Sequence, residues 1–121
     1  MIIGIGVDMV DIARFGRQLE RTPKLRARLF SAQEQSLAVH SLAARFAARE
    51  ALIKALGDSW HLTWGDFEVT RDEHRAPEFV MNPALESVLR ARGADRIHLT
   101  MTHEAGVATA FVVLEGRGVG S

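Results

Sequence analysis

Apolar residues at the start of the chain alternate with small ones. The run 2–7, IIGIGV, holds four β-branched residues separated by two glycines and ends at Asp8. This composition predicts a buried strand. Asp11 is a suitable N-cap, and the helical spacing of apolar residues across 12–19 predicts a helix that stops at the Thr-Pro pair 22–23.

The middle of the chain carries the clearest helical pattern. Residues 41–56 are rich in Ala, Leu and Arg, with neither Gly nor Pro before Gly57, which predicts a helix closed by that glycine. Ser31 and Glu34 have the spacing of a capping box and predict a further helix that starts near Ala32.

The second half of the chain predicts two short strands, a helix and a β-hairpin. The strands cover 67–71 and 78–81, the helix runs from Pro83 to the residue before Gly93, and the hairpin strands are 97–102 and 107–114. The predicted fold class is therefore α+β, with an antiparallel sheet and packed helices in a single domain over 1–115. Residues 116–121 are expected to form a disordered tail.

Composition narrows the possible chemistry. The 121 residues include no cysteine, which excludes a disulfide framework, a thiolate zinc site and a thiol nucleophile. The start of the chain lacks the basic residues of a signal peptide, and the apolar stretch 105–114 is too short to span a bilayer. We expect a soluble, cytoplasmic protein, and a chain this short favours burial of apolar surface in an oligomer.

Charge is distributed unevenly along the chain although the total is zero. Residues 1–56 hold nine basic and five acidic residues, whereas 57–121 hold six and ten, so the two parts carry +4 and −4. Within 14–28, six basic residues face one acidic residue, Glu20. A total charge of zero therefore does not exclude an electrostatic partner.

Two acidic positions interrupt apolar patterns. Asp8 at the end of a strand is either a turn or helix-cap aspartate or a carboxylate that handles a metal or a proton. Glu50 and Lys54 lie one helical turn apart and can form a solvated ion pair. Phe46 and Ile53 make the flank of this helix face apolar, however, which indicates that Glu50 turns inward and needs a cation.

Other polar residues suggest a phosphorylated ligand. Arg45 and Arg49 place two guanidinium groups on one helix face, which suits phosphate binding or a simple surface. His103 stands out by its position at the end of a strand, and the histidines lack the spacing of a zinc site. Two carboxylates without cysteine or clustered histidine favour Mg²⁺ together with substrate phosphates. This pattern indicates phosphoryl-type chemistry without identifying a substrate.

Three segments of the chain form a recognisable pattern: GIGVDMVDIARF at 4–15, RFAAREALIKALG at 45–57 and HLTMTHEAGVATAFVV at 98–113. In order and spacing they resemble the signature blocks of the holo-acyl-carrier-protein synthases, the short single-domain 4′-phosphopantetheinyl transferases. The chain departs from the family pattern in having Arg49 where Lys is usual and Arg75 in place of a turn glycine. It also lacks a Gly-Thr-Gly run in 57–63.

The resemblance implies the phosphopantetheinyl transferase fold and a set of site residues. Asp8 and Glu50 would bind Mg²⁺, which bridges the diphosphate of coenzyme A, and Lys54 would contact those phosphates and assist transfer. Arg45 and His103 would hold the 3′-phosphate. A serine hydroxyl of apo acyl carrier protein would attack the β-phosphorus and release 3′,5′-ADP. The base remains open among Glu50, Asp8 through a water on the metal, and Lys54.

The resemblance also implies partners. It implies a homotrimer with active sites at subunit boundaries, and docking of an acidic carrier protein, free or part of a large synthase, on the basic stretch. The docking residues we expect are Arg14, Arg21, Lys24 and Arg28. A solvated cationic surface is the alternative. A nucleic-acid site is disfavoured because the stretch lacks a stacking pattern of aromatics.

Two rival functions share the same fold. One is a non-catalytic module that binds a carrier protein or coenzyme A, and the other is a small nucleotide-binding regulatory protein. Loss of Asp8 or Glu50 would have favoured the first, and both residues are present.

Overall fold

The computed structural model describes residues 1–119, in which helices and strands alternate irregularly along the chain. In order they are β1 (Ile2–Asp11), α1 (Ile12–Arg21), α2 (Leu25–Leu29), α3 (Val39–Leu56), the 3₁₀ helix η1 (Trp64–Phe67), β2 (Val69–Arg71), β3 (Pro77–Phe79), α4 (Pro83–Arg92), β4 (Ala94–Glu104) and β5 (Val107–Gly116).

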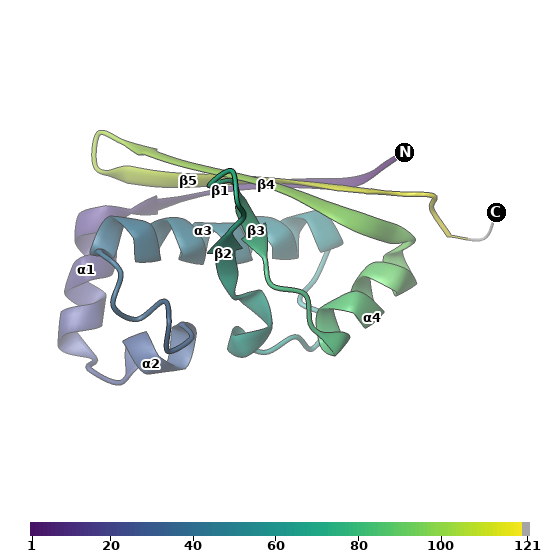
Figure 1. Cartoon of the computed structure of the whole chain (residues 1–121). Helices are drawn as coiled ribbons and strands as arrows, with labels where there is room; N and C mark the ends of the chain where they lie inside the picture. The colour runs from purple at the N-terminus through teal and green to yellow at the C-terminus, as the bar shows by residue number, and fades with distance from the viewer. Residues whose placement is uncertain (120–121) are drawn as a thin grey trace.

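A three-stranded antiparallel sheet, ordered β1-β5-β4, covers one side of α3. Figure 1 shows α3 running along the sheet, with α1 and α2 at the end where β4 turns into β5 and α4 at the other end. Strands β2 and β3 form a separate two-stranded hairpin. The structure thus confirms the predicted single-domain α+β class, with an antiparallel sheet and packed helices.

Two glycines in β1 allow the strand to lie directly on α3. A Cβ atom at Gly4 would overlap the carbonyl oxygen of Ala55, and one at Gly6 would overlap that of Ala51. Since no larger residue fits, these glycines set the distance between strand and helix. The next inward position of β1 is Asp8, so the close packing brings this carboxylate to the side of α3.

Capping residues that the sequence predicts lie at the starts or ends of three helices. The Asp11 side chain accepts from the Arg14 N–H at 2.8 Å, and Asn82 accepts from the Leu85 N–H at 2.9 Å. Gly57 and Gly93 close their helices in the left-handed conformation, with φ of 92° and 76°. Helix α3 begins at Val39, two residues earlier than predicted.

The predicted helix near Ala32 is wrong. Ser31 and Glu34 do form the reciprocal hydrogen bonds of a capping box, but residues 32–36 are turns, and the short helix α2 precedes them. The Glu34 carboxylate also accepts from the Val69 N–H at 3.1 Å and pairs with Arg45. These distant contacts hold the segment against β2 and α3, so its capping signal fixes a turn instead of starting a helix.

The sheet has one buried and one open face. Inward residues of β5, from Ala108 to Leu114, pack on α3, whereas the outer face exposes Ile5, Val7, Met9 and Phe111. Over the described part of the chain, the helices are too short or too polar for a membrane span.

The predicted disordered tail, residues 116–121, begins at the last residue of β5. Gly116 pairs with β4, and the Gly118 N–H donates to the Gly93 carbonyl at 3.0 Å. Residues 120 and 121 lie outside the described residues, so the domain boundary at residue 115 and the disordered tail stay predictions.

Candidate active site

Asp8 and Glu50 line one cavity between β1, α1 and α3, of about 360 Å³, which we call the carboxylate cavity. Arg14, Gln18 and Phe46 contribute to the same walls. Asp8 comes from the inner face of β1 and Glu50 from α3, so the packing of this strand on this helix joins two carboxylates that are 42 positions apart in the sequence. The cavity combines negative charge with an apolar wall.

Asp8 and Glu50 each have a cationic partner. Lys54 Nζ lies 3.2 Å from Asp8 Oδ1 and donates to the Val7 carbonyl at 2.9 Å, with 57% of the lysine side chain exposed. Arg49 Nη1 lies 2.7 Å from Glu50 Oε1. Glu50 therefore pairs with its neighbour Arg49, and Lys54 pairs across to β1 instead of forming the helix-surface pair with Glu50.

The donor set of the carboxylate cavity fits Mg²⁺ bound together with a phosphorylated ligand. Within residues 1–119, no three His, Asp or Glu side chains are grouped to hold a metal ion by themselves. Mg²⁺ commonly uses one or two carboxylates and takes its other ligands from substrate phosphates and water. Asp8 and Glu50 are oxygen donors of this kind, and Lys54 adds positive charge for the phosphates.

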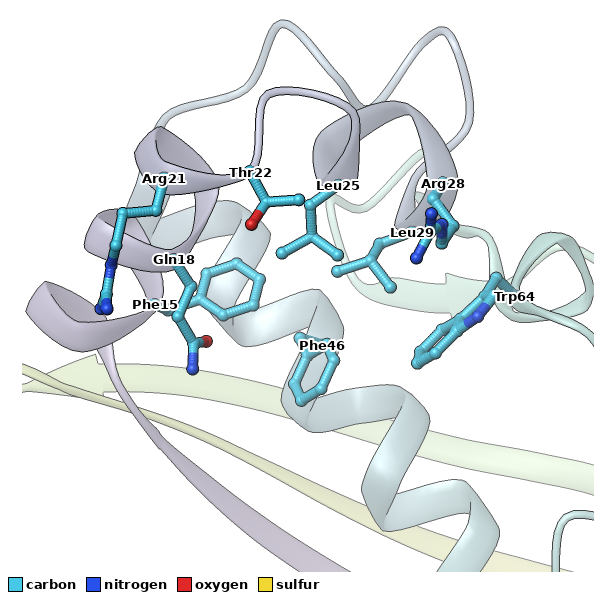
Figure 2. A pocket seen from close by; sticks show the side chains of 9 residues that line it. All are labelled: Phe15, Gln18, Arg21, Thr22, Leu25, Arg28, Leu29, Phe46 and Trp64. Atoms are coloured by element: carbon cyan, nitrogen blue, oxygen red, sulfur yellow. The ribbon is translucent and has the colours of Figure 1, made fainter.

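An apolar cavity of about 500 Å³ lies beside the carboxylate cavity and shares Phe15, Gln18 and Phe46 with it. Figure 2 shows the α1 residues Phe15 and Gln18 on one side of it, α2 above, and Phe46 and Trp64 below. Arg21 and Arg28 line it together with leucines of α2.

Three of the four predicted docking residues border these two cavities. Arg14 lines the carboxylate cavity, and Arg21 and Arg28 line the apolar one. Lys24 is the exposed residue immediately before α2. Arg26 differs because its Nη1 donates to the Gln35 carbonyl at 2.8 Å, which gives it a structural partner.

A second group of basic side chains lines a smaller cavity of about 100 Å³ near β4, which we call the arginine cavity. Arg45 of α3, Arg71 of β2 and His103 of β4 contribute to it, with His40 packed against His103 at 4.6 Å between ring centroids. Sequence analysis missed Arg71 and His40. Their proximity depends on where the β2–β3 hairpin and the start of α3 lie, and no local signal reports that.

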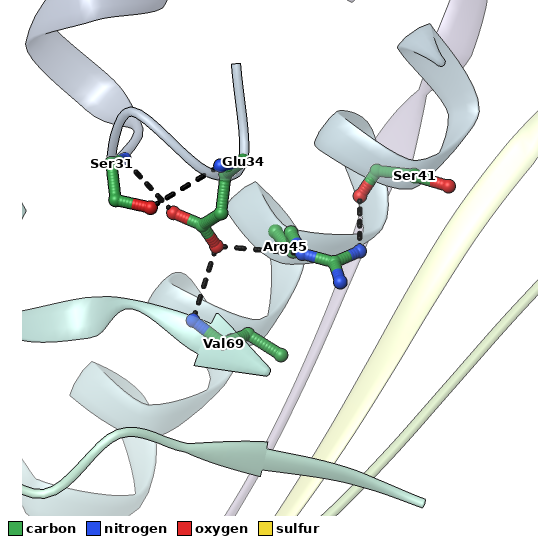
Figure 3. Close-up of polar contacts among 5 residues, drawn as sticks. All are labelled: Ser31, Glu34, Ser41, Arg45 and Val69. Carbon is green, nitrogen blue, oxygen red and sulfur yellow. Dashed lines mark hydrogen bonds and ion pairs between the residues drawn. The ribbon is translucent and has the colours of Figure 1, made fainter. Parts of the chain in front are cut away.

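Arg45 is held by a buried carboxylate. Its Nε lies 3.4 Å from Glu34 Oε2, with 8% and 6% of the two side chains exposed, and its Nη1 donates to the Ser41 carbonyl at 3.4 Å. Figure 3 shows Glu34 bridging Ser31, Val69 and Arg45. Burial lowers the pKa of the Arg45 guanidinium below its ordinary value, Glu34 opposes that shift, and Arg71 adds to it.

The structure thus divides the predicted site residues into two sets. Asp8, Glu50 and Lys54 meet near β1, and Arg45 and His103 meet near β4. Because β1 and β4 are the two edges of the sheet, a single chain presents the sets at opposite sides of α3. Each set holds charges suited to phosphate, but they line separate cavities.

Comparison with known proteins agrees with this geometry. The family model described as 4′-phosphopantetheinyl transferase superfamily matches residues 4–111. A holo-[acyl-carrier-protein] synthase of Leifsonia xyli subsp. xyli is 61% identical over 115 residues, which cover 95% of this chain and 98% of that protein.

Solved structures give the same result. The crystal structure of holo-[acyl-carrier-protein] synthase from Neisseria meningitidis superimposes with a TM-score of 0.86 at 33% identity, covering 95% of this chain and 99% of that one. The Helicobacter pylori synthase, solved in complex with coenzyme A, gives a TM-score of 0.80 at 28% identity, covering 92% and 99%. The chain therefore belongs to the 4′-phosphopantetheinyl transferase superfamily and, within it, to the holo-acyl-carrier-protein synthases.

Proposed function

We propose that this protein transfers the 4′-phosphopantetheine group of coenzyme A to a serine of an apo acyl carrier protein, in a reaction that depends on Mg²⁺. The observation that carries the proposal is the carboxylate cavity, where Asp8 and Glu50 lie with Lys54 beside Asp8. Relatives over nearly the whole chain are named holo-[acyl-carrier-protein] synthase, and the Helicobacter pylori structure contains coenzyme A. The products are the holo carrier protein and 3′,5′-ADP.

Asp8, Glu50 and the adjacent Lys54 have separate roles in the transfer. Asp8 and Glu50 would hold Mg²⁺, which when bound neutralises the diphosphate and makes the β-phosphorus easier to attack. Lys54 supplies a further positive charge to the leaving 3′,5′-ADP, since phosphoryl transfer depends mainly on positioning and charge neutralisation. The serine Oγ loses its proton as it attacks. Glu50, Asp8 and Lys54 are the candidate bases, and the serine Oγ–phosphorus bond replaces the bond between phosphorus and the bridging oxygen.

The arginine cavity is the proposed site of the 3′-phosphate of coenzyme A. Arg45 and His103 are the expected ligands, and Arg71 supplies a second guanidinium in the same cavity. A phosphate monoester carries nearly two negative charges, and guanidinium groups bind such groups through paired hydrogen bonds.

We further propose that the protein works as a homotrimer in which the arginine cavity of one subunit faces the carboxylate cavity of the next. Two observations support this arrangement. The two cavities of one chain lie at opposite edges of the sheet, and the outer sheet face exposes Ile5, Val7, Met9 and Phe111. An apolar patch of this kind is typical of a subunit interface. A sedimentation mass of one chain would contradict the trimer.

The carrier protein is proposed to dock on α1 and α2. Arg14, Arg21, Lys24 and Arg28 would pair with its acidic residues, and the apolar cavity between Arg21 and Arg28 would accept an apolar side chain. Charge pairs at the rim with an apolar contact at the centre are the usual organisation of a protein interface. This surface adjoins the carboxylate cavity, which brings the serine close to the β-phosphorus.

One experiment distinguishes this function from its rivals. The protein is incubated with coenzyme A, Mg²⁺ and an apo carrier protein, and the mass of the carrier is measured by mass spectrometry. We expect the carrier to gain the mass of one phosphopantetheine group. Binding of coenzyme A without any gain in mass would indicate a nucleotide-binding regulator, and binding of the carrier alone would indicate a non-catalytic module.

A further inference from the structure

Arg49 reaches a neighbour that helix geometry normally directs away from it. Successive residues of an α-helix point about 100° apart and do not face each other. Arg49 Nη1 nevertheless lies 2.7 Å from Glu50 Oε1. The contact therefore requires the arginine side chain to bend toward Glu50, a conformation that packing from outside the two residues can constrain.

Trp64 supplies this constraint. The guanidinium carbon of Arg49 lies 3.5 Å from the centre of a Trp64 ring, and Phe67 and Phe46 lie at 5.3 and 5.9 Å from it. Only 16% of the Arg49 side chain is exposed, and its Nε has no hydrogen-bond partner in the part of the chain that the structure describes. The position of the guanidinium is therefore determined by the aromatic rings and by Glu50, since cation–π contact and burial replace hydrogen bonds at Nε.

The tryptophan is itself held in place. It is the first residue of η1, and the preceding Thr63 forms a capping box with Asp66, whose carboxylate accepts from the Thr63 N–H at 2.8 Å. Trp64 also stacks with Phe46 of α3, with 6.3 Å between ring centroids. The aromatic surface under Arg49 is thus attached both to η1 and to α3.

We propose that Trp64 and Arg49 are positioning residues that orient the Glu50 carboxylate for a divalent cation. The proposal rests on the proposed function, because it takes Glu50 as a ligand of Mg²⁺. Arg49 donates to Oε1, so Oε2 is the oxygen that would take a cation in the carboxylate cavity. Hydrogen-bond partners of ligating carboxylates commonly set metal affinity, and their removal typically weakens it about 10- to 100-fold. If Arg49 instead only neutralised Glu50, its release would strengthen cation binding.

The test compares the two tryptophans of the chain. Trp64→Leu removes the ring under Arg49 and keeps every charge. Trp60→Leu is the matched control, because the Trp60 ring N–H donates to the Leu56 carbonyl and, within residues 1–119, the rings next to the Arg49 guanidinium are those of Phe46, Trp64 and Phe67. Mn²⁺ binding to the full chain is measured by electron paramagnetic resonance with coenzyme A present and the carrier protein absent. The carrier is left out because Trp64 also lines the apolar cavity.

We expect Trp64→Leu to weaken Mn²⁺ binding about tenfold, Trp60→Leu to leave it unchanged, and Trp64→Phe to lose less than Trp64→Leu. Unchanged or tighter binding by Trp64→Leu overturns the positioning role, and so does an equal loss in the control. A wild-type protein that binds coenzyme A but no Mn²⁺ would instead contradict the Mg²⁺ site of the proposed function.

A second measurement does not depend on how well Trp64→Leu folds. In a Trp60→Phe protein, Trp64 is the sole tryptophan, and its fluorescence reports the environment of the guanidinium above it. We expect Mg²⁺, added with coenzyme A, to shift this emission, and we expect Glu50→Gln in the same protein to abolish the shift. An unchanged emission on addition of Mg²⁺, under conditions where Mn²⁺ binding is detected, overturns the proposal.

Discussion

The carboxylate cavity and the arginine cavity flank the same helix but are stabilised in different ways. In the first, Asp8 pairs with a lysine whose side chain is 57% exposed, and the cavity holds about 360 Å³. In the second, Arg45 is buried against Glu34, and the space is about 100 Å³. The larger cavity has room for a metal ion together with phosphates, whereas the smaller one has room for a single small group beside the buried Arg45.

Under the proposed function, this difference separates the residues of the chemical step from those that bind coenzyme A. The carboxylate cavity depends on β1 packing directly on α3, where Gly4 and Gly6 permit close approach. The arginine cavity depends on three distant segments that Glu34 joins together. We therefore expect substitutions in the first to lower kcat and substitutions in the second to raise KM for coenzyme A.

The largest effect is expected for Glu50→Gln. Removing one ligand charge leaves the metal ion and the developing negative charge on phosphate poorly stabilised, so kcat should fall by about 10³-fold. The fold should persist, because Glu50 lies at the edge of a cavity. Transfer is assayed across a range of Mg²⁺ concentrations. The control is Glu20→Gln, which changes an exposed carboxylate of α1. Near-normal turnover at limiting Mg²⁺ would refute the ligand role.

Glu34→Gln tests whether the Glu34 carboxylate stabilises Arg45 in the arginine cavity. It leaves Arg45 buried without a counterion, and breaking a buried pair in this way typically costs about 3 kcal/mol of unfolding free energy. Denaturant unfolding measures this loss, with exposed Glu20→Gln expected to change stability by less than about 0.5 kcal/mol. If the two variants are equally stable, Glu34 does not organise the cavity.

A smaller, selective effect is expected for His103→Gln. This substitution removes one proposed contact to the 3′-phosphate, so KM for coenzyme A should rise about tenfold, the equivalent of about 1.4 kcal/mol, with kcat little changed. A substrate lacking the 3′-phosphate distinguishes the cause, because the variant and the wild type should use it equally well. A variant that is equally impaired with both substrates would place His103 elsewhere in the mechanism.

The smallest effect is expected for the docking surface. Arg14→Glu combined with Arg21→Glu should raise KM for the carrier protein several-fold, about 1 kcal/mol, and weaken its salt dependence, since rim charges act mainly on encounter. KM for coenzyme A should stay close to that of the wild type. An equal rise in KM for both substrates would show that these arginines support the fold of the carboxylate cavity instead of binding a partner.

Sequence alone determined the features that depend on near neighbours. Helix ends followed from Asp11, Asn82, Gly57 and Gly93, because caps are made within a few residues. Alternation predicted the β4–β5 hairpin for the same reason. The three motif blocks identified the family. Asp8 and Glu50 line the same cavity, and their binding of Mg²⁺ stays a prediction.

Tertiary structure decided what those residues contact. The capping box of Ser31 and Glu34 has the local signal of a helix start, yet the carboxylate binds Val69 and Arg45 from distant segments. Arg49 faces Glu50 because Trp64, 15 positions further on, packs beneath it. Placing the two cavities at opposite edges of the sheet required the strand order. Each of these outcomes depends on packing between segments far apart in the chain, and local patterns carry no information about such distances.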